Sequence, residues 1–173
     1  LAEEDVPAPE ILPLLLNALY ALGMLHKNQT QVKAAFELRL LSLGGFEPML
    51  EGCAVCGKTL PEEPMLDVVQ GMLHCRSCAL QGHKGLSMPL CADSLAAMRH
   101  VVSCPPKRLY AFSLADAPLC RMADAAEAFC AAQLERGFRT LDFYKELCSY
   151  DVLQRDQSPT EVERKEIYGM DGQ

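Results

Sequence analysis

Apolar side chains recur every three or four residues along most of the chain, which is the periodicity of amphipathic α-helices. In the first such segment, residues 10–26, Pro13 falls in the first turn, where proline is tolerated. The apolar series of this segment comprises Leu12, Leu15, Leu16, Leu19, Leu22 and Leu25. Further helices are predicted at residues 31–43, 93–103, 116–136 and 140–150. The pattern therefore predicts a mainly α protein whose first helix belongs to the core.

The helical pattern stops in residues 52–80, where prolines and Gly71 leave room only for short strands, predicted at 65–69 and 72–74. Helix resumes at Asp93, which is a favourable N-cap residue. The predicted organisation is a helical domain with a small β-hairpin insertion. Its parts are a loose segment at 1–9, the helical domain at 10–51 and 81–150, the insertion at 52–80 and a charged tail at 151–173.

Composition and charge narrow the functional classes. Half of the 173 residues are apolar, but no apolar run reaches the ~18 residues of a membrane-spanning helix. The start, LAEEDVPAPE, lacks an initiator Met and the features of a secretory signal, so we expect a cytoplasmic protein and a fragment of a longer chain. The net charge of −7 disfavours a general nucleic-acid binder, although residues 76–145 carry 9 basic and 6 acidic groups.

Four of the nine cysteines have the spacing of a metal site. Cys53 and Cys56 form one C-x2-C pair, and Cys75 and Cys78 form a second pair 18 residues further on. Two such turns supply the four thiolates that zinc binds in a closed, structural site. One structural zinc ion is predicted, in a zinc ribbon. A redox C-x-x-C motif is the alternative, but no thioredoxin-like strand and helix surround either pair.

The remaining side chains suggest no catalytic site. His74 and His83 lie near the cysteine pairs, but their spacing is poorer, and His74 is expected to face outward. The other five cysteines are scattered through helical segments and are predicted to be buried free thiols. No nucleophile–base pair or phosphate-binding loop is apparent, so a non-enzymatic protein is predicted. Lys107 and Arg108 lie beside aromatic residues, which suits single-stranded nucleic acid, although a solvated turn is the simpler interpretation.

Taken together, these motifs resemble the C-terminal part of RecO, the bacterial recombination mediator of DNA repair. The resemblance covers about residues 11–149. It rests on LLLNALYAL, on FELRLLSLGGFEPML followed by the cysteine pairs and QGMLHCRSC, and on GFRTLDFYKEL near the end. It implies an all-helical domain with an inserted zinc ribbon. The N-terminal OB-fold barrel of the family is not expected among these residues.

The resemblance also implies partners. RecO proteins anneal DNA coated with single-stranded DNA-binding protein (SSB), and with RecR they help to load RecA. The family contacts the C-terminal tail of SSB through its helical domain and binds DNA mainly through the barrel. This chain is therefore expected to bind DNA weakly and to be associated with the nucleoid when it acts on DNA. The candidate DNA- or partner-binding residues are Lys33, Arg39, Lys107, Arg108 and Arg139.

Two departures from the family pattern stand out. Ala34 and Ala35 occupy positions where family members often carry basic residues, and Arg139-Thr140 replaces the more usual Lys-Ser. Two other functional classes stay open at this point. One is a zinc-ribbon regulator or assembly factor that binds only proteins, and the other is a thiol-based redox enzyme.

Overall fold

The computed structural model describes residues 9–79, 85–135, 137 and 139–156. The chain divides into two compact units, residues 1–135 and 136–173. Within the described residues, no helix is both long and apolar enough to cross a membrane.

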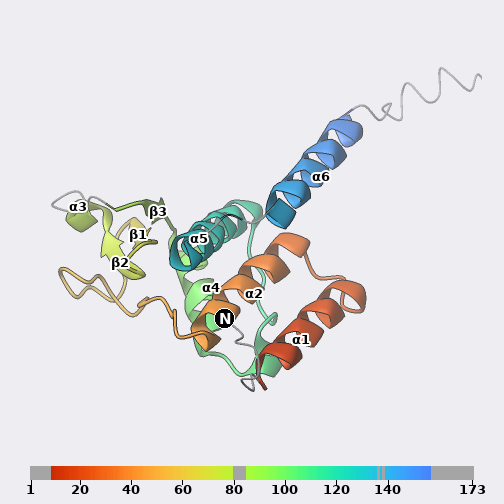
Figure 1. Ribbon diagram of the computed structural model, residues 1–173. Helices are drawn as coiled ribbons and strands as arrows, with labels where there is room; N and C mark the ends of the chain where they lie inside the picture. The colour runs from red at the N-terminus through yellow and green to blue at the C-terminus, as the bar shows by residue number, and fades with distance from the viewer. Residues whose placement is uncertain (1–8, 80–84, 136, 138, 157–173) are drawn as a thin grey trace, which may run out of the picture. The chain divides into compact units, whose positions relative to one another are not determined.

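The helical part of the first unit is organised around α2 (Gln29–Leu43). This helix packs against α1 (Ile11–Gly23), α4 (Ala92–Ser103) and α5 (Asp116–Leu134), as Figure 1 shows. Its fully buried residues are Ala34, Ala35, Leu38 and Leu41. The two alanines allow neighbouring backbones to approach closely, so basic side chains would not fit at these two positions. The departure from the family pattern therefore has a packing reason.

The second predicted helix is confirmed, and it begins two residues earlier than expected. The Asn28 side chain accepts hydrogen bonds from the backbone N–H groups of Thr30 (2.8 Å) and Gln31 (3.3 Å). This is a side-chain N-cap, which satisfies two N–H groups that have no partner within the helix. Gly44 is the C-cap.

Helix α1 is also confirmed, but the face predicted for its core side was wrong. Leu14, Ala18 and Ala21 are buried, whereas Leu12 is 61% exposed and Leu19 is 57% exposed. The helix is apolar on almost every side, so periodicity alone did not single out one face. The two small alanines set the contact with α2, because they let the helices lie close together.

The remaining helices of this unit follow the predicted pattern closely. Helix α5 buries Leu119, Met122, Ala125, Ala126 and Phe129. The N-cap of α4 is Cys91, not Asp93: the Ser94 side chain accepts a 2.8 Å hydrogen bond from the Cys91 N–H, and Asp93 lies in the first turn. Between α4 and α5 is a short 3-10 helix, η1 (Pro106–Arg108), within a segment predicted to be extended or turn-like.

In the described part of the chain, three short strands form an antiparallel sheet in the order β2-β1-β3. Strands β1 (Pro64–Asp67) and β2 (Met72–Cys75) are the predicted hairpin, with Leu66 opposite Leu73. Strand β3 (Ser87–Pro89) pairs with β1 and was not predicted. It has only three residues, too few to show an alternating pattern.

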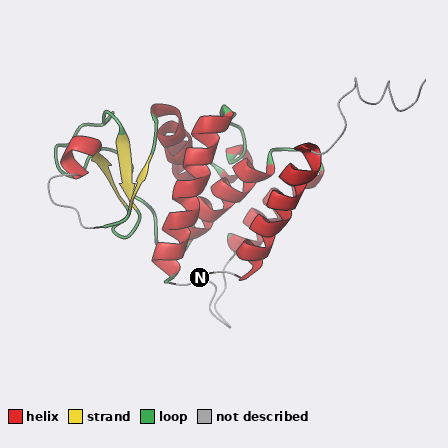
Figure 2. Ribbon diagram, turned by 90° about the horizontal axis from the view of Figure 1, so that it is seen from above, coloured by secondary structure: helices red, strands yellow, loops and turns green. Residues whose placement is uncertain are grey.

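The sheet shares its core with the helices. Leu66, Val68 and Leu73 are fully buried in the same cluster as the helical core. At the hairpin turn, the side-chain amide of Gln133 on α5 donates to the carbonyls of Val68 (2.8 Å) and Val69 (3.0 Å). Figure 2 shows the sheet lying beside the helices of this unit. The cysteine pairs are therefore mounted on an element that is fixed to the helical core.

The second unit contains α6 (Arg139–Asp156). The predicted last helix is confirmed and extends past its expected end at residue 150. The rest of the charged tail, 157–173, lies outside the described residues, as do most of the predicted loose segment, 1–8, and His83.

Candidate metal centre

The four predicted cysteines converge on one point. Their sulfur atoms all lie within 4.8 Å of one another, and the sulfurs of Cys56 and Cys75 are 3.5 Å apart. A tetrahedron with metal–sulfur bonds of ~2.3 Å has edges of about 3.8 Å, so this spacing fits a four-thiolate metal site. The four cysteines are free, and 3.5 Å is far longer than a disulfide bond of about 2.05 Å.

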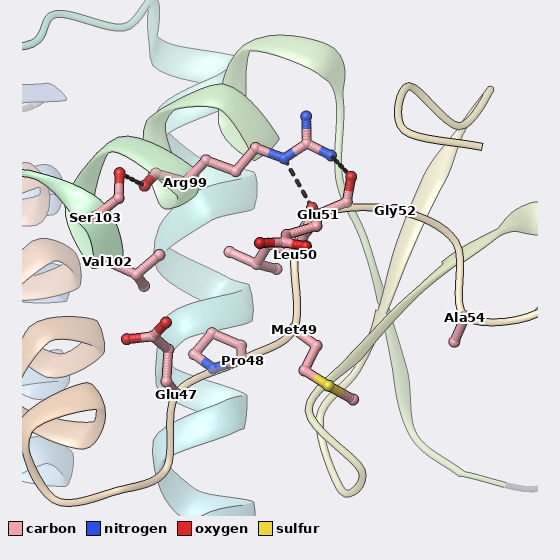
Figure 3. Close-up of a pocket in the computed structure, with 10 residues that line it drawn as sticks. All are labelled: Glu47, Pro48, Met49, Leu50, Glu51, Gly52, Ala54, Arg99, Val102 and Ser103. Carbon is pink, nitrogen blue, oxygen red and sulfur yellow. Dashed lines mark hydrogen bonds between the residues drawn. The ribbon is translucent and has the colours of Figure 1, made fainter. Parts of the chain in front are cut away.

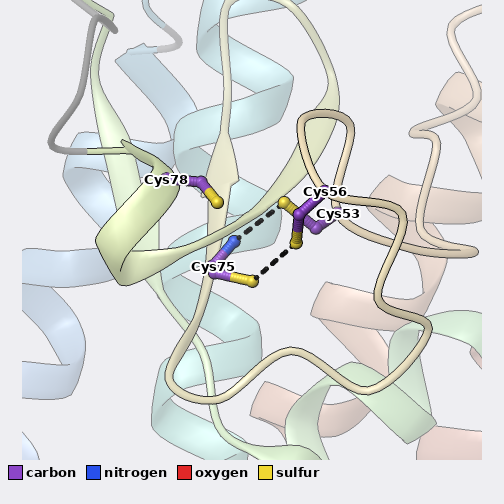
Figure 4. Close-up of side chains that lie close together, drawn as sticks. All are labelled: Cys53, Cys56, Cys75 and Cys78. Carbon is purple, nitrogen blue, oxygen red and sulfur yellow. Dashed lines mark hydrogen bonds between the residues drawn. The ribbon is translucent and has the colours of Figure 1, made fainter.

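Each pair is delivered by a different local structure (Figure 4). Cys53 and Cys56 belong to a tight loop in which the Gly57 N–H donates to the Cys53 carbonyl (2.8 Å). Gly57 has a φ of 72°, a left-handed conformation that glycine adopts without strain. The Cys53 N–H donates to the carbonyl of Lys58 (2.9 Å), which closes the loop. The glycine after the second cysteine therefore allows the tight turn of the loop.

The second pair lies at the junction of a strand and a short helix. Cys75 ends β2, and Cys78 lies one turn later in α3 (Arg76–Ala79). The Cys75 N–H also donates to the sulfur of Cys53 (3.3 Å), which links the two pairs. Hydrogen bonds from backbone N–H groups are typical support for the sulfur ligands of a metal.

The cluster has an electrostatic imbalance that a cation would relieve. Burial alone would raise the pKa of the Cys53 thiol, but backbone N–H groups, chiefly those of Cys56 and Cys75, lower this pKa to about 5. Burial raises the pKa of the Cys75 thiol to about 12, and the nearby sulfurs of Cys56 and Cys53 add to the shift. The Cys53 thiol thus ionises easily, whereas the Cys75 thiol does not, because it is buried and because adjacent thiolates repel each other. A bound metal ion would allow all four to ionise together.

The arrangement fits a structural site. Four sulfurs fill a tetrahedral coordination sphere and leave no position for a reacting water. The prediction that His74 faces outward was wrong, because its side chain is only 1% exposed. Leu73, His74 and Cys75 are consecutive in β2 and all buried, so both faces of this strand are covered.

Among the predicted basic residues, the structure brings Arg39 and Arg108 to one region. Burial raises the pKa of the Cys104 thiol at the end of α4, and the charges of Arg39 and Arg108 both oppose this shift. Lys107 precedes Arg108 in η1. The Arg39 side chain lies at a cleft of about 190 Å³ between α1, α2 and η1. Apolar residues of that cleft are Pro13, Leu14, Leu43, Pro106 and Leu109.

The other two predicted basic residues are placed differently. The Lys33 ammonium contacts the carboxylates of Glu37 (2.8 Å) and Glu127 (3.0 Å). Two carboxylates already balance its charge, so Lys33 acts here as a link between α2 and α5. Arg139 begins α6 in the second unit.

Arg99 is a structural residue that the sequence reasoning missed. Its guanidinium donates to the carbonyls of Leu50 (2.7 Å), Glu51 (3.0 Å) and Thr59 (2.6 Å). These carbonyls flank the Cys53–Cys56 loop on both sides, so Arg99 fastens the loop to α4. No side-chain motif could have shown this, because all three acceptors belong to the backbone.

Arg99 also borders a groove that no sequence motif indicated. The groove has a volume of about 670 Å³ and lies between residues 47–54 and the end of α4 (Figure 3). We call it the ribbon groove. Its other lining residues from α4 are Val102 and Ser103.

The fold and site define a class: a helical protein with a four-cysteine ribbon that can hold a metal ion. The family model described as "Recombination protein O C terminal" matches residues 1–142, and the chain belongs to this family. It is similar to the DNA repair protein RecO of Acetivibrio thermocellus, with 28% identity over 83% of this chain and 57% of that protein. The RecO of Roseiflexus sp. is 29% identical over 94% of this chain and 56% of that protein. The chain thus spans little more than half the length of these relatives.

Proposed function

We propose that this chain is the scaffold and partner-binding part of a RecO-type mediator of DNA repair and homologous recombination. In this role it assists annealing of SSB-coated DNA and, with RecR, the loading of RecA at the nucleoid in the cytoplasm. It acts by binding and not by catalysis. Membership of the recombination protein O family is the single observation that carries this proposal.

We further propose that the four cysteines hold one zinc ion with a structural role. The convergence of four sulfurs within 4.8 Å supports this assignment. An all-thiolate tetrahedral set is typical of structural zinc. When bound, the ion supplies a cross-link between the Cys53–Cys56 loop and the end of β2.

The SSB tail is proposed to dock at the cleft beside Arg39. A C-terminal tail ends in a carboxylate, and an arginine next to an apolar cleft can receive such a group together with apolar side chains. Lys107 and Arg108 are exposed cations of η1, between Pro106 and Leu109, which line the cleft. Single-stranded DNA is proposed to bind the same basic region weakly, because the net charge of the chain is −7.

A pull-down with an SSB tail peptide and with RecR tests the proposal. We expect the chain to retain both partners. The variant Lys107→Glu/Arg108→Glu should lose the peptide, and because both side chains are exposed this variant should still fold. Retention of neither partner by the folded, metal-loaded chain would contradict the mediator function and favour a ribbon protein that serves other partners.

A further inference from the structure

The ribbon groove shares no lining residue with the cleft beside Arg39 and includes none of the four clustered cysteines. The Arg39 guanidinium nevertheless reaches the edge of the groove, where it donates to the carbonyl of Val102 (2.6 Å). One wall is the chain from Glu47 to Ala54, and the other is the end of α4. Both walls belong to the first unit. Figure 3 shows the Glu47 carboxylate pointing toward Val102 across this space. The groove therefore joins the helical core to the Cys53–Cys56 loop.

The apolar wall of the groove is held in place before any partner arrives. The Met49 N–H donates to the Gly71 carbonyl (2.7 Å), and the Met49 carbonyl accepts from the Leu73 N–H (3.2 Å), so Met49 forms a bridge to β2. The Arg99 side chain holds the next residue, Leu50, through its carbonyl. A fixed backbone reduces the entropy that a bound segment would have to overcome.

This fixed backbone presents an accessible apolar side chain. Met49 is 55% exposed, although its backbone is hydrogen-bonded on both sides. Methionine is unbranched and polarisable, so it adapts to differently shaped apolar partners. Val102 and the buried ring of Pro48 continue the apolar lining.

The described lining of the groove carries two carboxylates and one guanidinium, an excess of one negative charge. Glu47 and Glu51 are exposed, and neither forms an ion pair with a residue that the structure describes. Arg99 is the one cation in the described lining, and its guanidinium is directed at three backbone carbonyls. A second guanidinium, that of Arg39, is held at the edge of the groove by the carbonyl of Val102 (2.6 Å). Two unpaired carboxylates beside an apolar strip favour a partner that carries positive charge next to an apolar side chain.

We propose that the ribbon groove is a docking site for a segment of a partner protein that presents Lys or Arg next to a large apolar side chain. The apolar side chain lies against Met49 and Val102, and the cation approaches Glu47 and Glu51. This proposal does not depend on the SSB or RecR assignments, because it is argued from the lining residues of the groove and not from the cleft beside Arg39.

Fluorescence anisotropy with two labelled 12-residue peptides tests the proposal on the full chain. Both peptides carry the same leucines, and their polar positions are all Lys in one and all Glu in the other. The Lys peptide should bind, and its affinity should fall as the salt concentration rises. The Glu peptide should bind much more weakly. Methyl NMR should show a shift of the Met49 methyl group on addition of the Lys peptide.

Matched charge variants distinguish binding at the groove from nonspecific attraction of a cationic peptide to an acidic protein. Glu47→Gln/Glu51→Gln should lower the affinity for the Lys peptide about fivefold. The control Glu62→Gln/Glu135→Gln removes the same charge from exposed positions outside the groove and should change binding less than twofold. Equal weakening by both pairs, equal binding of both peptides or an unmoved Met49 methyl group would overturn the proposal.

Discussion

The Nε of Arg99 donates a 2.7 Å hydrogen bond to the carbonyl of Leu50, three residues before the first metal-site cysteine. The other end of the guanidinium reaches the carbonyls of Glu51 and Thr59. One side chain of α4 therefore holds both ends of the Cys53–Cys56 loop. This contact fixes the Cys53–Cys56 loop to α4.

Arg99→Met should lower the free energy of unfolding by about 2 kcal/mol, because three backbone carbonyls lose a charged donor. Methionine retains much of the aliphatic length of arginine, so the loss reflects the hydrogen bonds more than the packing. Urea unfolding followed by circular dichroism measures this change. Arg76→Met is the control: Arg76 contacts Glu63 at 3.5 Å on an exposed surface, and its replacement should cost well under 1 kcal/mol. Equal effects of the two variants would contradict the role of Arg99.

Elemental analysis of the purified chain should find one zinc ion per molecule. Cys53→Ser should abolish binding of the ion and lower the melting temperature by about 10 °C or more, because the metal connects the two halves of the ribbon. Cys120→Ser is the matched control, since Cys120 is an exposed free thiol on α5 and is not part of the cluster. A metal-free protein that melts at the same temperature as the loaded protein would refute a structural ion.

The sequence predicted the helices, the hairpin and the cysteine cluster better than it predicted which of their side chains are buried. Helix positions follow from apolar periodicity, and the metal cluster follows from C-x2-C spacing, because both signals are local. The buried face of α1 was predicted wrongly because leucines surround the helix and the small residues Ala18 and Ala21 make the contact. The burial of His74 depends on what covers the second face of β2, which no local pattern records.

Strand β3 and the ribbon groove were not predicted, because both depend on backbone contacts between segments far apart in the sequence. Strand β3 is only three residues long and pairs with β1 through main-chain atoms. The ribbon groove arises where the chain after α2 forms a bridge to β2 at Met49 and meets α4 at Arg99. Contacts between segments so far apart in sequence leave no periodicity or spacing to detect.

Tyr110→Phe should leave the stability at neutral pH unchanged or raise it by about 1 kcal/mol. The Tyr110 side chain is buried, and its hydroxyl has no hydrogen-bond partner among the described residues. Removing a buried polar group that lacks a partner removes a desolvation cost. Thermal unfolding at pH 7 measures the change, and a loss of more than 1 kcal/mol would indicate a partner for this hydroxyl.

The same tyrosine predicts a loss of stability at high pH. Burial raises the pKa of Tyr110 to about 12, from an ordinary value of 10.0. The folded state disfavours the phenolate. The free energy of unfolding is therefore highest below pH 10 and falls as the pH rises toward 12. Over this pH window, the free energy of unfolding should fall less for Tyr110→Phe than for the unchanged chain. Tyr20→Phe, at an exposed position, should lose as much stability as the unchanged chain. Urea unfolding at pH 9, 10 and 11 measures the difference.

Lys107→Gln/Arg108→Gln should weaken the binding of single-stranded oligonucleotides and reduce its dependence on salt. Each cation that neutralises a phosphate releases counterions, so the loss of two should lower the slope of log K against log salt by about 1.4 for a single strand. The effect should be similar for all oligonucleotide sequences, because phosphate contacts carry no base information. Lys33→Gln is the control, since Lys33 is already paired with Glu37 and Glu127, and it should leave the slope unchanged. Fluorescence anisotropy from 20 to 200 mM salt gives both slopes, and a slope unaffected by the η1 double variant would place the DNA contacts elsewhere on the chain.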